Sequence, residues 1–267
     1  MNALRLTGRY LAVSIRSQMQ YRASWMLGAV GHFAVSATEI VGIWALFHRF
    51  RSLGGWSLPE VALLYGLVHT AFALAEGGVR GFDTFPNMVR SGEFDRVLLR
   101  PRSTALQVAA RELQLLRLGR LTQGVIVLVW AWLTLGIAAT PGHLALCAGS
   151  ILGAAALFAG LFIVTATISF WTTESLELVN VLTYGGTEAG QFPLDIYRPW
   201  FRNLFLFIVP LGCVIYFPAL ALLGREDTLL GAPAWFLHAA PLVGFAFLIL
   251  SLQVWRVGVR HYRSTGS

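Results

Sequence analysis

Few ionisable residues lie inside the apolar stretches of this sequence, and they are the first candidates for chemistry. Glu39 lies near the middle of one apolar run, His32 precedes it by seven residues on the same helical face, and His69 is central in the next run. Within a membrane, a Glu39–His69 pair could relay protons or bind a cation, or it could simply hold two helices together. The pair favours one candidate function, an ion-coupled carrier or channel that works without a partner, and leaves the structural role open.

The motifs of common enzymes are missing from the sequence. There is no HExxH, no CxxC pair and no GxSxG, so we expect neither a metal site nor a hydrolase. All 20 basic residues are arginine, and a P-loop needs a lysine to reach the nucleotide phosphates. We therefore expect this chain not to be an enzyme. An intramembrane enzyme of unfamiliar arrangement and a scaffold that transports nothing are the other interpretations.

The composition is typical of a membrane protein. Of the 267 residues, 56% are hydrophobic and 12% are charged, whereas roughly a quarter are charged in soluble domains. A net charge of +7 would suit nucleic acid in a soluble domain. Here the arginines cluster beside apolar runs, which indicates contact with an anionic leaflet. We expect membrane lipid, and no nucleic acid, as a partner.

The apolar runs predict an all-α integral membrane protein in which residues 1–267 form one transmembrane domain. A helix needs about 20 apolar residues to cross a bilayer, and the six predicted spans are residues 25–47, 61–79, 121–138, 144–173, 175–190 and 235–255. Residues 1–24 combine apolar residues with arginines and predict a helix in the membrane interface. From the pattern alone, either 175–190 or 201–223 crosses the membrane, because Pro210 and Pro218 interrupt the second of these.

Small residues in the fourth predicted span indicate close helix packing. Gly149 and Gly153 are spaced as in a GxxxG motif, which lets two helix backbones approach each other. The contact could lie within one chain or between two copies.

Residues 81–120, between the second and third predicted spans, form a long and heavily charged segment. They include seven arginines and four acidic residues, which hydrocarbon does not accommodate. The sequence predicts a short helix that begins near Glu93 and an amphipathic helix over residues 106–116. The segment either rests on lipid headgroups or provides a docking surface for a cytoplasmic motor.

The arginine distribution predicts the orientation of the chain. With six spans, fifteen arginines lie on one side, in residues 1–24, residues 80–120 and the segment after residue 255, and three lie on the other, Arg49, Arg51 and Arg225. The side of Arg198 and Arg202 depends on which segment is the fifth span. Positive charge favours the cytoplasmic side. Both termini and the charged segment are therefore predicted to be cytoplasmic.

Two stretches of the sequence resemble a known family. Residues 92–101, GEFDRVLLRP, resemble the G-x-x-D-x-x-L-L-x-P stretch of the six-span membrane subunits of type-2 ABC exporters. The second stretch comprises residues 192–197, FPLDIY, followed by Trp200-Phe201-Arg202, Pro210 and residues 216–219, YFPA. The resemblance covers almost the whole chain in length, number of spans and order of elements.

The resemblance implies a permease of an export system in the bacterial plasma (inner) membrane. Two permeases, either two copies of this chain or this chain and a homologous one, would form the translocation pathway. Two copies of a separate ABC ATPase subunit would bind ATP and Mg²⁺, so this chain would hold no cofactor itself. The low number of fixed charges in the spans favours an amphipathic or apolar substrate.

The resemblance also implies functional residues. Coupling to the ATPase would involve residues 82–102, with the candidates Phe82, Asp83, Glu93, Phe94, Asp95, Arg96, Arg100 and Pro101. Residues 197–223 would form re-entrant helices before the last span, which makes 175–190 the fifth span. The candidates for the gate or pathway are Pro193, Tyr197, Trp200, Pro210, Tyr216 and Pro218.

Overall fold

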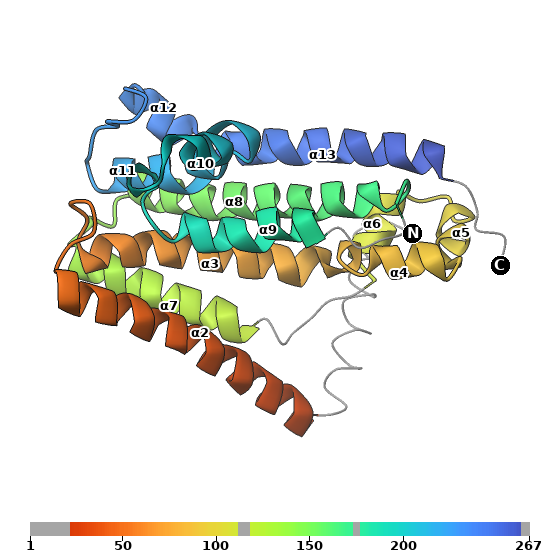
Figure 1. The fold of residues 1–267 in the computed structure, drawn as a ribbon, viewed down its shortest axis with the longest axis horizontal. Helices are drawn as coiled ribbons and strands as arrows, with labels where there is room; N and C mark the ends of the chain where they lie inside the picture. Colours follow the sequence, from red (N-terminus) through yellow and green to blue (C-terminus); the bar gives the residue numbers. More distant parts are fainter. Residues whose placement is uncertain (1–21, 112–117, 173–176, 263–267) are drawn as a thin grey trace.

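The computed structural model describes residues 22–111, 118–172 and 177–262. In these ranges the regular secondary structure is helical, apart from one isolated bridge between Leu53 and Trp56. The long helices run roughly side by side, and short helices gather at both ends of the bundle (Figure 1). We call these ends the α5 end and the α12 end. Residues 1–21 of the predicted interfacial helix lie outside the described residues.

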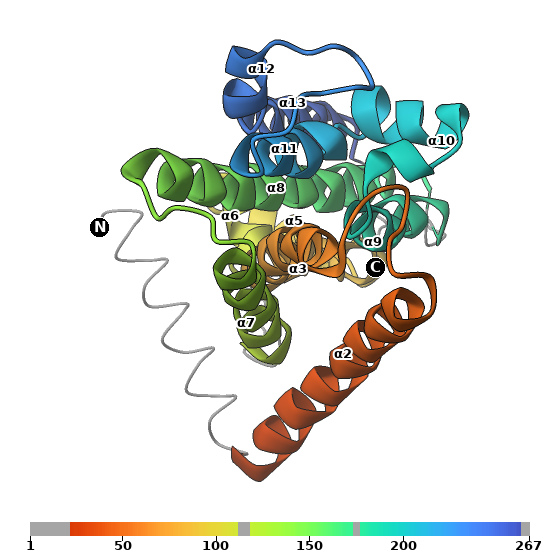
Figure 2. The same cartoon turned by 90° about the vertical axis from the view of Figure 1, so that its left-hand side faces the viewer.

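The central helix of the bundle is α3 (Leu58–Val79), which α7, α8 and α9 surround when it is seen nearly end-on (Figure 2). It packs against both α7 and α8, and α13 packs on α8. Most of its side chains are buried, which the all-round apolar sequence predicts for an interior helix. The surrounding long helices are α7 (Leu118–Thr134), α8 (Pro141–Ile168), α9 (Glu177–Gly190) and α13 (Leu242–His261).

The start of α3 is fixed by local chemistry. The Ser57 backbone N–H donates to Glu60 Oε2 at 2.7 Å, and the Ser57 hydroxyl donates to the same oxygen at 2.8 Å. Pro59 occupies the first turn, where a helix needs no N–H. These residues set the helix register that directs His69 and Glu76 into the bundle.

The first long helix, α2 (Arg22–Phe50), tilts away from the bundle (Figure 1). Among its described side chains only Ile43 and Phe47 are buried. Large apolar side chains such as Trp44 are exposed along it. This exposure suits a helix that faces lipid or a partner.

Three described helical segments are long and apolar enough to cross a membrane: Leu58–Arg90, Pro141–Ile168 and Leu242–His261. A fourth candidate is the pair Pro199–Ile208 and Gly212–Leu222, which meet at 81° and form either a broken span or a re-entrant loop. These segments agree with a membrane protein, and the count of six spans stays a prediction. Helices α2, α7 and α9 do lie where the first, third and fifth spans are predicted.

The helix over the predicted last span differs from its predicted bounds. Helix α12 (Ala234–Ala239) ends just before Pro241, and α13 begins at Leu242. Proline removes a backbone donor and disfavours helical backbone in the residue before it. The apolar run 235–255 therefore contains parts of two helices, and the membrane-length helix extends to His261.

Short elements cover the two ends of the bundle. At the α5 end they are η1 (Arg80–Phe82), α4 (Phe85–Arg90), α5 (Glu93–Leu98) and α6 (Thr104–Ala109). At the α12 end they are η3 (Leu194–Ile196), α10 (Pro199–Asn203), η4 (Leu204–Ile208), η5 (Gly212–Tyr216), α11 (Phe217–Leu222) and α12. The predicted amphipathic helix over 106–116 is described only as far as the end of α6, because residues 112–117 lie outside the described ranges.

Glycines bring α8 and α13 into backbone contact. A Cβ on Gly244 would collide with the carbonyl oxygen of Gly153, and a Cβ on Gly153 would collide with the carbonyl oxygen of Pro241. Gly153 of the GxxxG motif therefore packs within the chain. At Gly149 a Cβ would meet only Pro241 Cβ, at 4.0 Å.

We predict that Gly153→Ala lowers the thermal unfolding midpoint of the purified chain, whereas Gly149→Ala leaves it nearly unchanged. Forcing a methyl group into a tight backbone contact costs about 1–3 kcal/mol. Thermal unfolding in detergent, followed by size-exclusion chromatography, measures both variants. Equal midpoints for the two variants would contradict the described α8–α13 contact.

Candidate functional site

An aromatic cluster fixes the charged segment to the ends of two long helices. In this cluster the Phe94 ring lies 5.0 Å from both the Phe85 and Tyr262 rings, and the Trp255 ring lies 4.9 Å from Phe85. Edge-to-face pairs at such distances add about 0.5–1.5 kcal/mol each to the effect of burial. We call the cluster the aromatic anchor; its members are Phe82, Phe85, Phe94, Phe170, Trp255 and Tyr262.

The aromatic anchor changes the interpretation of two predicted coupling residues. Phe94 and Phe82 are both buried, so they contribute to the interior of the protein and not to its surface. Trp255 Nε1 also donates to Thr104 Oγ1 at 3.0 Å, which attaches α6 to α13. The segment α4–α5–α6 is thus held against the bundle from several sides.

The polar coupling candidates surround this anchor on the outside. Glu93 forms an ion pair with Arg111 across α5 and α6. Burial and the nearby Asp95 carboxylate raise the pKa of Tyr262 to about 12, so this hydroxyl stays protonated at physiological pH. Asp95 therefore acts between α5 and the end of α13.

Arginine and leucine side chains form the outer face of α5. Arg96, Arg100 and Pro101 are exposed, and Leu99 has 85% of its surface exposed. A groove of about 300 Å³ opens beside them between α5 and α6. This face is both basic and apolar, which suits contact with a macromolecule.

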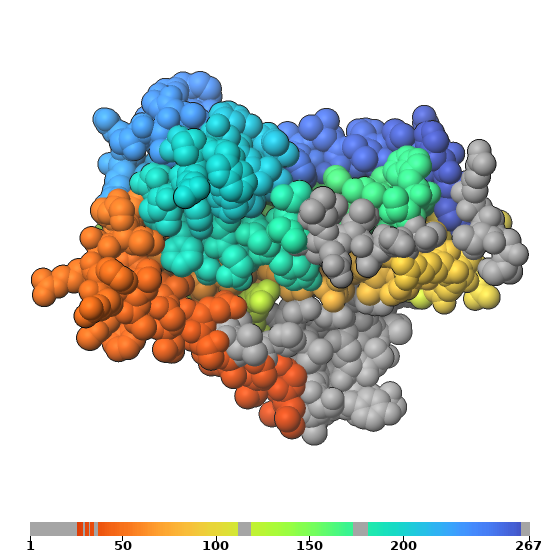
Figure 3. All heavy atoms as spheres, viewed as in Figure 1, coloured from red at the N-terminus to blue at the C-terminus, as the bar shows by residue number. Residues whose placement is uncertain are grey.

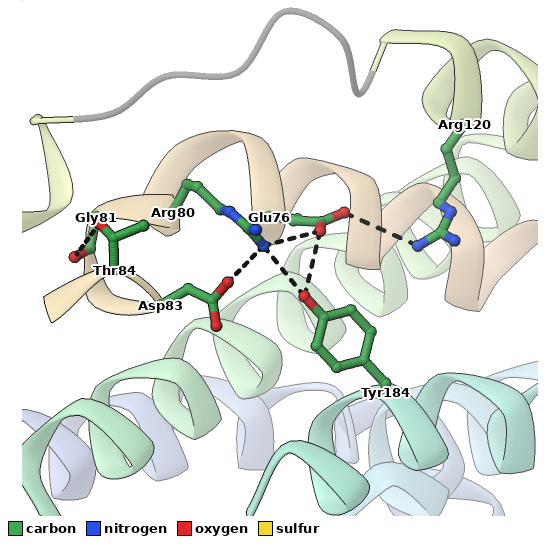
Figure 4. A network of polar contacts seen from close by, with 7 residues as sticks. All are labelled: Glu76, Arg80, Gly81, Asp83, Thr84, Arg120 and Tyr184. Carbon is green, nitrogen blue, oxygen red and sulfur yellow. Dashed lines mark hydrogen bonds and ion pairs between the residues drawn. The ribbon is translucent and has the colours of Figure 1, made fainter. Parts of the chain in front are cut away.

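A buried network of charges connects the segment to three long helices (Figure 4). Glu76 is fully buried on α3, with Arg80 Nη1 at 3.3 Å and Arg120 Nη1 of α7 at 3.8 Å from its carboxylate oxygens. Tyr184 of α9 lies in the same network, because Arg80 Nη1 donates to its hydroxyl at 3.1 Å. Arg80 also pairs with Asp83 at 2.6 Å, and Asp83 begins the charged segment.

The sequence analysis missed Glu76 as a candidate residue. Its signal was present, because an acidic residue inside a predicted span carries an arginine four positions later. A buried charge is stable only when paired. Glu76 therefore serves as the shared counter-charge of Arg80 and Arg120, which joins α3 to α7.

The predicted intramembrane residues contact a common neighbour. Tyr65 donates from its hydroxyl to Glu39 Oε2 at 3.3 Å, and its ring stacks on the His69 ring at 3.9 Å. His69 Nε2 is 3.3 Å from Gln191 Oε1. The contacts described for Glu39 and His69 thus run through Tyr65. The side chain of His32 lies outside the described side chains.

A second carboxylate lies at the same level of the bundle. Gln191, which contacts His69 midway along α3, donates from Nε2 to Glu188 Oε2 at 2.9 Å. Glu188 is exposed on α9. The side chains of α9 and α10, in teal and cyan, lie beside those of the first described helices, in red and orange, on this face of the molecule (Figure 3).

The gate candidates lie in the bent helix pair at the α12 end. The 81° bend falls at residues 209–211 and therefore at Pro210. Pro218 does not bend the chain, because it occupies the first turn of α11, where proline is tolerated. Tyr216 and Pro218 are buried.

The other gate candidates differ in their exposure. Tyr197 donates from its hydroxyl to the Ala189 carbonyl oxygen at 3.1 Å, which attaches this region to α9. Pro193 is buried and immediately precedes η3. Trp200 is 67% exposed.

Polar contacts hold the bent pair to the loop before α3. Trp56 Nε1 donates to Asp195 Oδ2 at 2.9 Å, and the Arg225 guanidinium lies 4.7 Å from the centre of the Trp56 ring. Arg225 also pairs with Glu60 at 2.6 Å. Trp56 and Glu60 did not appear among the sequence candidates, because neither lies in the stretches that resemble the family.

The family comparison agrees with this architecture. A family model described as ABC-2 family transporter protein matches residues 33–266. The chain belongs to the ABC-2 transporter family. It is thus a multi-pass membrane protein and a permease subunit of an ABC transporter. No curated protein and no solved structure matches the chain.

Membership of the ABC-2 transporter family confirms the resemblance found in the sequence. It also implies association with an ABC ATPase subunit.

We predict that Glu76→Gln destabilises the permease much more than Glu93→Gln. Removing one partner of a buried ion pair costs about 3–5 kcal/mol, whereas exposed pairs such as Glu93–Arg111 contribute about 0–1 kcal/mol. The thermal unfolding midpoints of the two variants give the comparison. If both variants unfolded at the temperature of the unchanged chain, the carboxylate of Glu76 would not be the counter-charge described.

Proposed function

We propose that this permease forms one half of the translocation unit of an ABC exporter in the bacterial inner membrane. Two permeases, identical or homologous, enclose the pathway, and two copies of a separate ATPase subunit bind ATP and Mg²⁺. The termini and the α5 end lie in the cytoplasm. The observation that carries this proposal is the charged segment α4–α5–α6, which is firmly anchored on its inner side and exposed on its outer side.

The length of the central helix supports a cytoplasmic position for α5. Helix α3 comprises 22 residues, or about 33 Å at 1.5 Å per residue. The hydrocarbon core is about 30 Å thick. Because α3 alone is long enough to cross it, η1, α4 and α5, which follow its end, lie beyond the hydrocarbon, so the exposed Leu99 faces water and not lipid tails. A partner protein that covers this face accounts for its exposure.

Two internal connections suit the transmission of movement from such a partner. The aromatic anchor passes a displacement of α5 to the ends of α8 and α13. The Glu76 network passes it to α7 and α9 through Arg120 and Tyr184. ATP-driven movement of the partner would thereby tilt the spans and open the bent helix pair at the α12 end.

The exposed Glu188 supports a second permease beside α9. A carboxylate at mid-membrane depth is costly against lipid and is usually found facing protein or a water-filled pathway. Placing a second permease against α9 supplies such an environment and puts the pathway between the two. An exported amphipathic substrate would then move along this interface.

The second candidate function, a carrier or channel without a partner, rests on the contacts that Glu39 and His69 share with Tyr65. It predicts ion-driven transport in vesicles that contain this chain alone, and loss of that transport in Glu39→Gln. The exporter proposal requires no transport under those conditions.

The first test of the exporter is co-purification. We expect the tagged chain, extracted from its native membrane in mild detergent, to bring a P-loop ATPase in stoichiometric amount, as identified by mass spectrometry. A chain that emerges alone under conditions that keep other ABC complexes intact would overturn the proposal.

A second test separates docking from folding. We predict that Arg96→Ala with Leu99→Ala weakens ATPase binding and uncouples ATP hydrolysis from transport by about tenfold or more, because both side chains lie on the outer face of α5. Thermal stability should not change, since neither is buried. The matched control is Arg49→Ala with Phe50→Ala, which removes an exposed arginine and an exposed apolar residue at the opposite end. Equal coupling in the two double variants would count against docking at α5.

A further inference from the structure

Two carboxylates lie at the middle of the bundle. Glu39 of α2 is partly buried and Glu188 of α9 is exposed. A chain of contacts through Tyr65, His69 and Gln191 connects them. The nearby cation Arg120 of α7 already pairs with Glu76 at 3.8 Å. The site therefore has an excess of negative charge at a depth where a carboxylate requires a counter-charge.

An apolar groove lies beside Glu39. It has a volume of about 470 Å³ and is bounded by α2, α3 and α7, with Ile43, Trp44, Ile126 and Trp130 in its walls. Tyr65 belongs to the same wall, and its hydroxyl is the group that donates to Glu39. A groove of this size holds a drug-sized apolar molecule or chain. Glu39, which precedes the groove residues Ile40 and Val41 and bonds to Tyr65, therefore lies next to the groove.

A buried acceptor without a partner lies at the same place. Gln123 of α7 is 3% exposed, and its Nε2 donates to the Tyr65 hydroxyl at 3.2 Å. Its Oε1 has no hydrogen-bond partner within the described residues. The groove residues Ile126 and Val127 follow Gln123 by three and four positions on α7. Residues at this spacing lie on the same helix face, so Gln123 lies on the groove side of α7. An unsatisfied buried oxygen indicates that a donor is missing.

We propose that the permease binds a cationic amphiphile whose apolar tail lies in this groove and whose protonated amine lies at Glu39 and Gln123, with Glu188 as the second carboxylate. A protonated amine supplies both the positive charge and the N–H donors that the site lacks. The proposal rests on the proposed function only in treating this amphiphile as the cargo.

Other occupants fit the site less well. A phospholipid would hold its phosphate at headgroup depth and offer only acyl chain to the two carboxylates. A second copy of the chain would bring arginines only from near the ends of the long helices or from outside them, as they lie in the described ranges. Both alternatives leave the two carboxylates without a counter-charge and Gln123 Oε1 without a donor.

The test uses the chain alone in nanodiscs of zwitterionic phosphatidylcholine. Brominated dodecylamine is the probe, and brominated dodecanol and dodecanoate are its neutral and anionic counterparts of equal chain length. Bromine quenches tryptophan fluorescence on contact, and Trp44 and Trp130 line the groove. We expect the amine to quench at a mole fraction about tenfold lower than the alcohol. Trp44→Phe with Trp130→Phe should remove most of this quenching.

Charge variants establish where the amine binds. In Glu39→Gln and in Glu188→Gln we expect the preference for the amine over the alcohol to fall about tenfold, whereas Glu226→Gln, in an exposed loop, should keep it. Glu188 is exposed, so its variant keeps the fold even if Glu39→Gln does not. Equal quenching by all three probes, or an amine preference unchanged in Glu188→Gln, overturns the proposal and identifies the groove as an ordinary lipid contact.

This assay contains no ATPase, so its outcome is independent of docking. If the chain binds the amine but no ATPase co-purifies with it, the proposed amine site stands and the proposed exporter function fails. If the ATPase co-purifies but the chain shows no preference for the amine, only the proposed substrate class fails.

Discussion

The structure depends on attaching a charged, water-facing segment rigidly to helices that lie in hydrocarbon. The aromatic anchor meets this constraint: Phe94, in the middle of charged sequence, is buried against Phe85, Tyr262 and Trp255. The Glu76 network provides the second attachment, nearer the membrane. Together they join the segment to all of the long helices except α2. Helix α2 is outside these attachments; it contacts α7 and α3 and leaves a groove between itself and them.

Helix positions could be predicted from the sequence because membrane spans depend on local composition. The long apolar runs predicted the bounds of α2, α3, α7, α8 and α9 to within a few residues. The predicted last span was shifted because Ala240 and Pro241 are apolar, and hydropathy does not register that proline interrupts a helix. Pro210 bends the chain as predicted, whereas Pro218 does not, because its effect depends on the position it takes within a helix.

The candidate site was harder to predict because its residues act through contacts between distant parts of the chain. The charges around Glu93 identified the segment, but nothing in its neighbours shows that Phe94 points inward, since Tyr262 and Trp255 come much later in the sequence. Glu76 appeared to be one polar residue in an apolar run until Arg120 and Tyr184 were placed beside it. Glu39 and His69 were candidates from the sequence, and the structure places Glu39 partly buried on α2 and His69 buried on α3. Tyr65, which contacts both, was not recognised.

The hydrogen bond from Trp255 to Thr104 joins residues that are 151 positions apart. During synthesis the segment α4–α5–α6 is therefore made well before the helix that holds it, and it cannot reach its final position until α13 has entered the membrane. A similar delay applies at the α12 end, because Trp56 is synthesised well before Asp195, whose carboxylate accepts its hydrogen bond. The aromatic anchor, and with it the final position of α4–α5–α6, thus becomes complete only after α13 has been made.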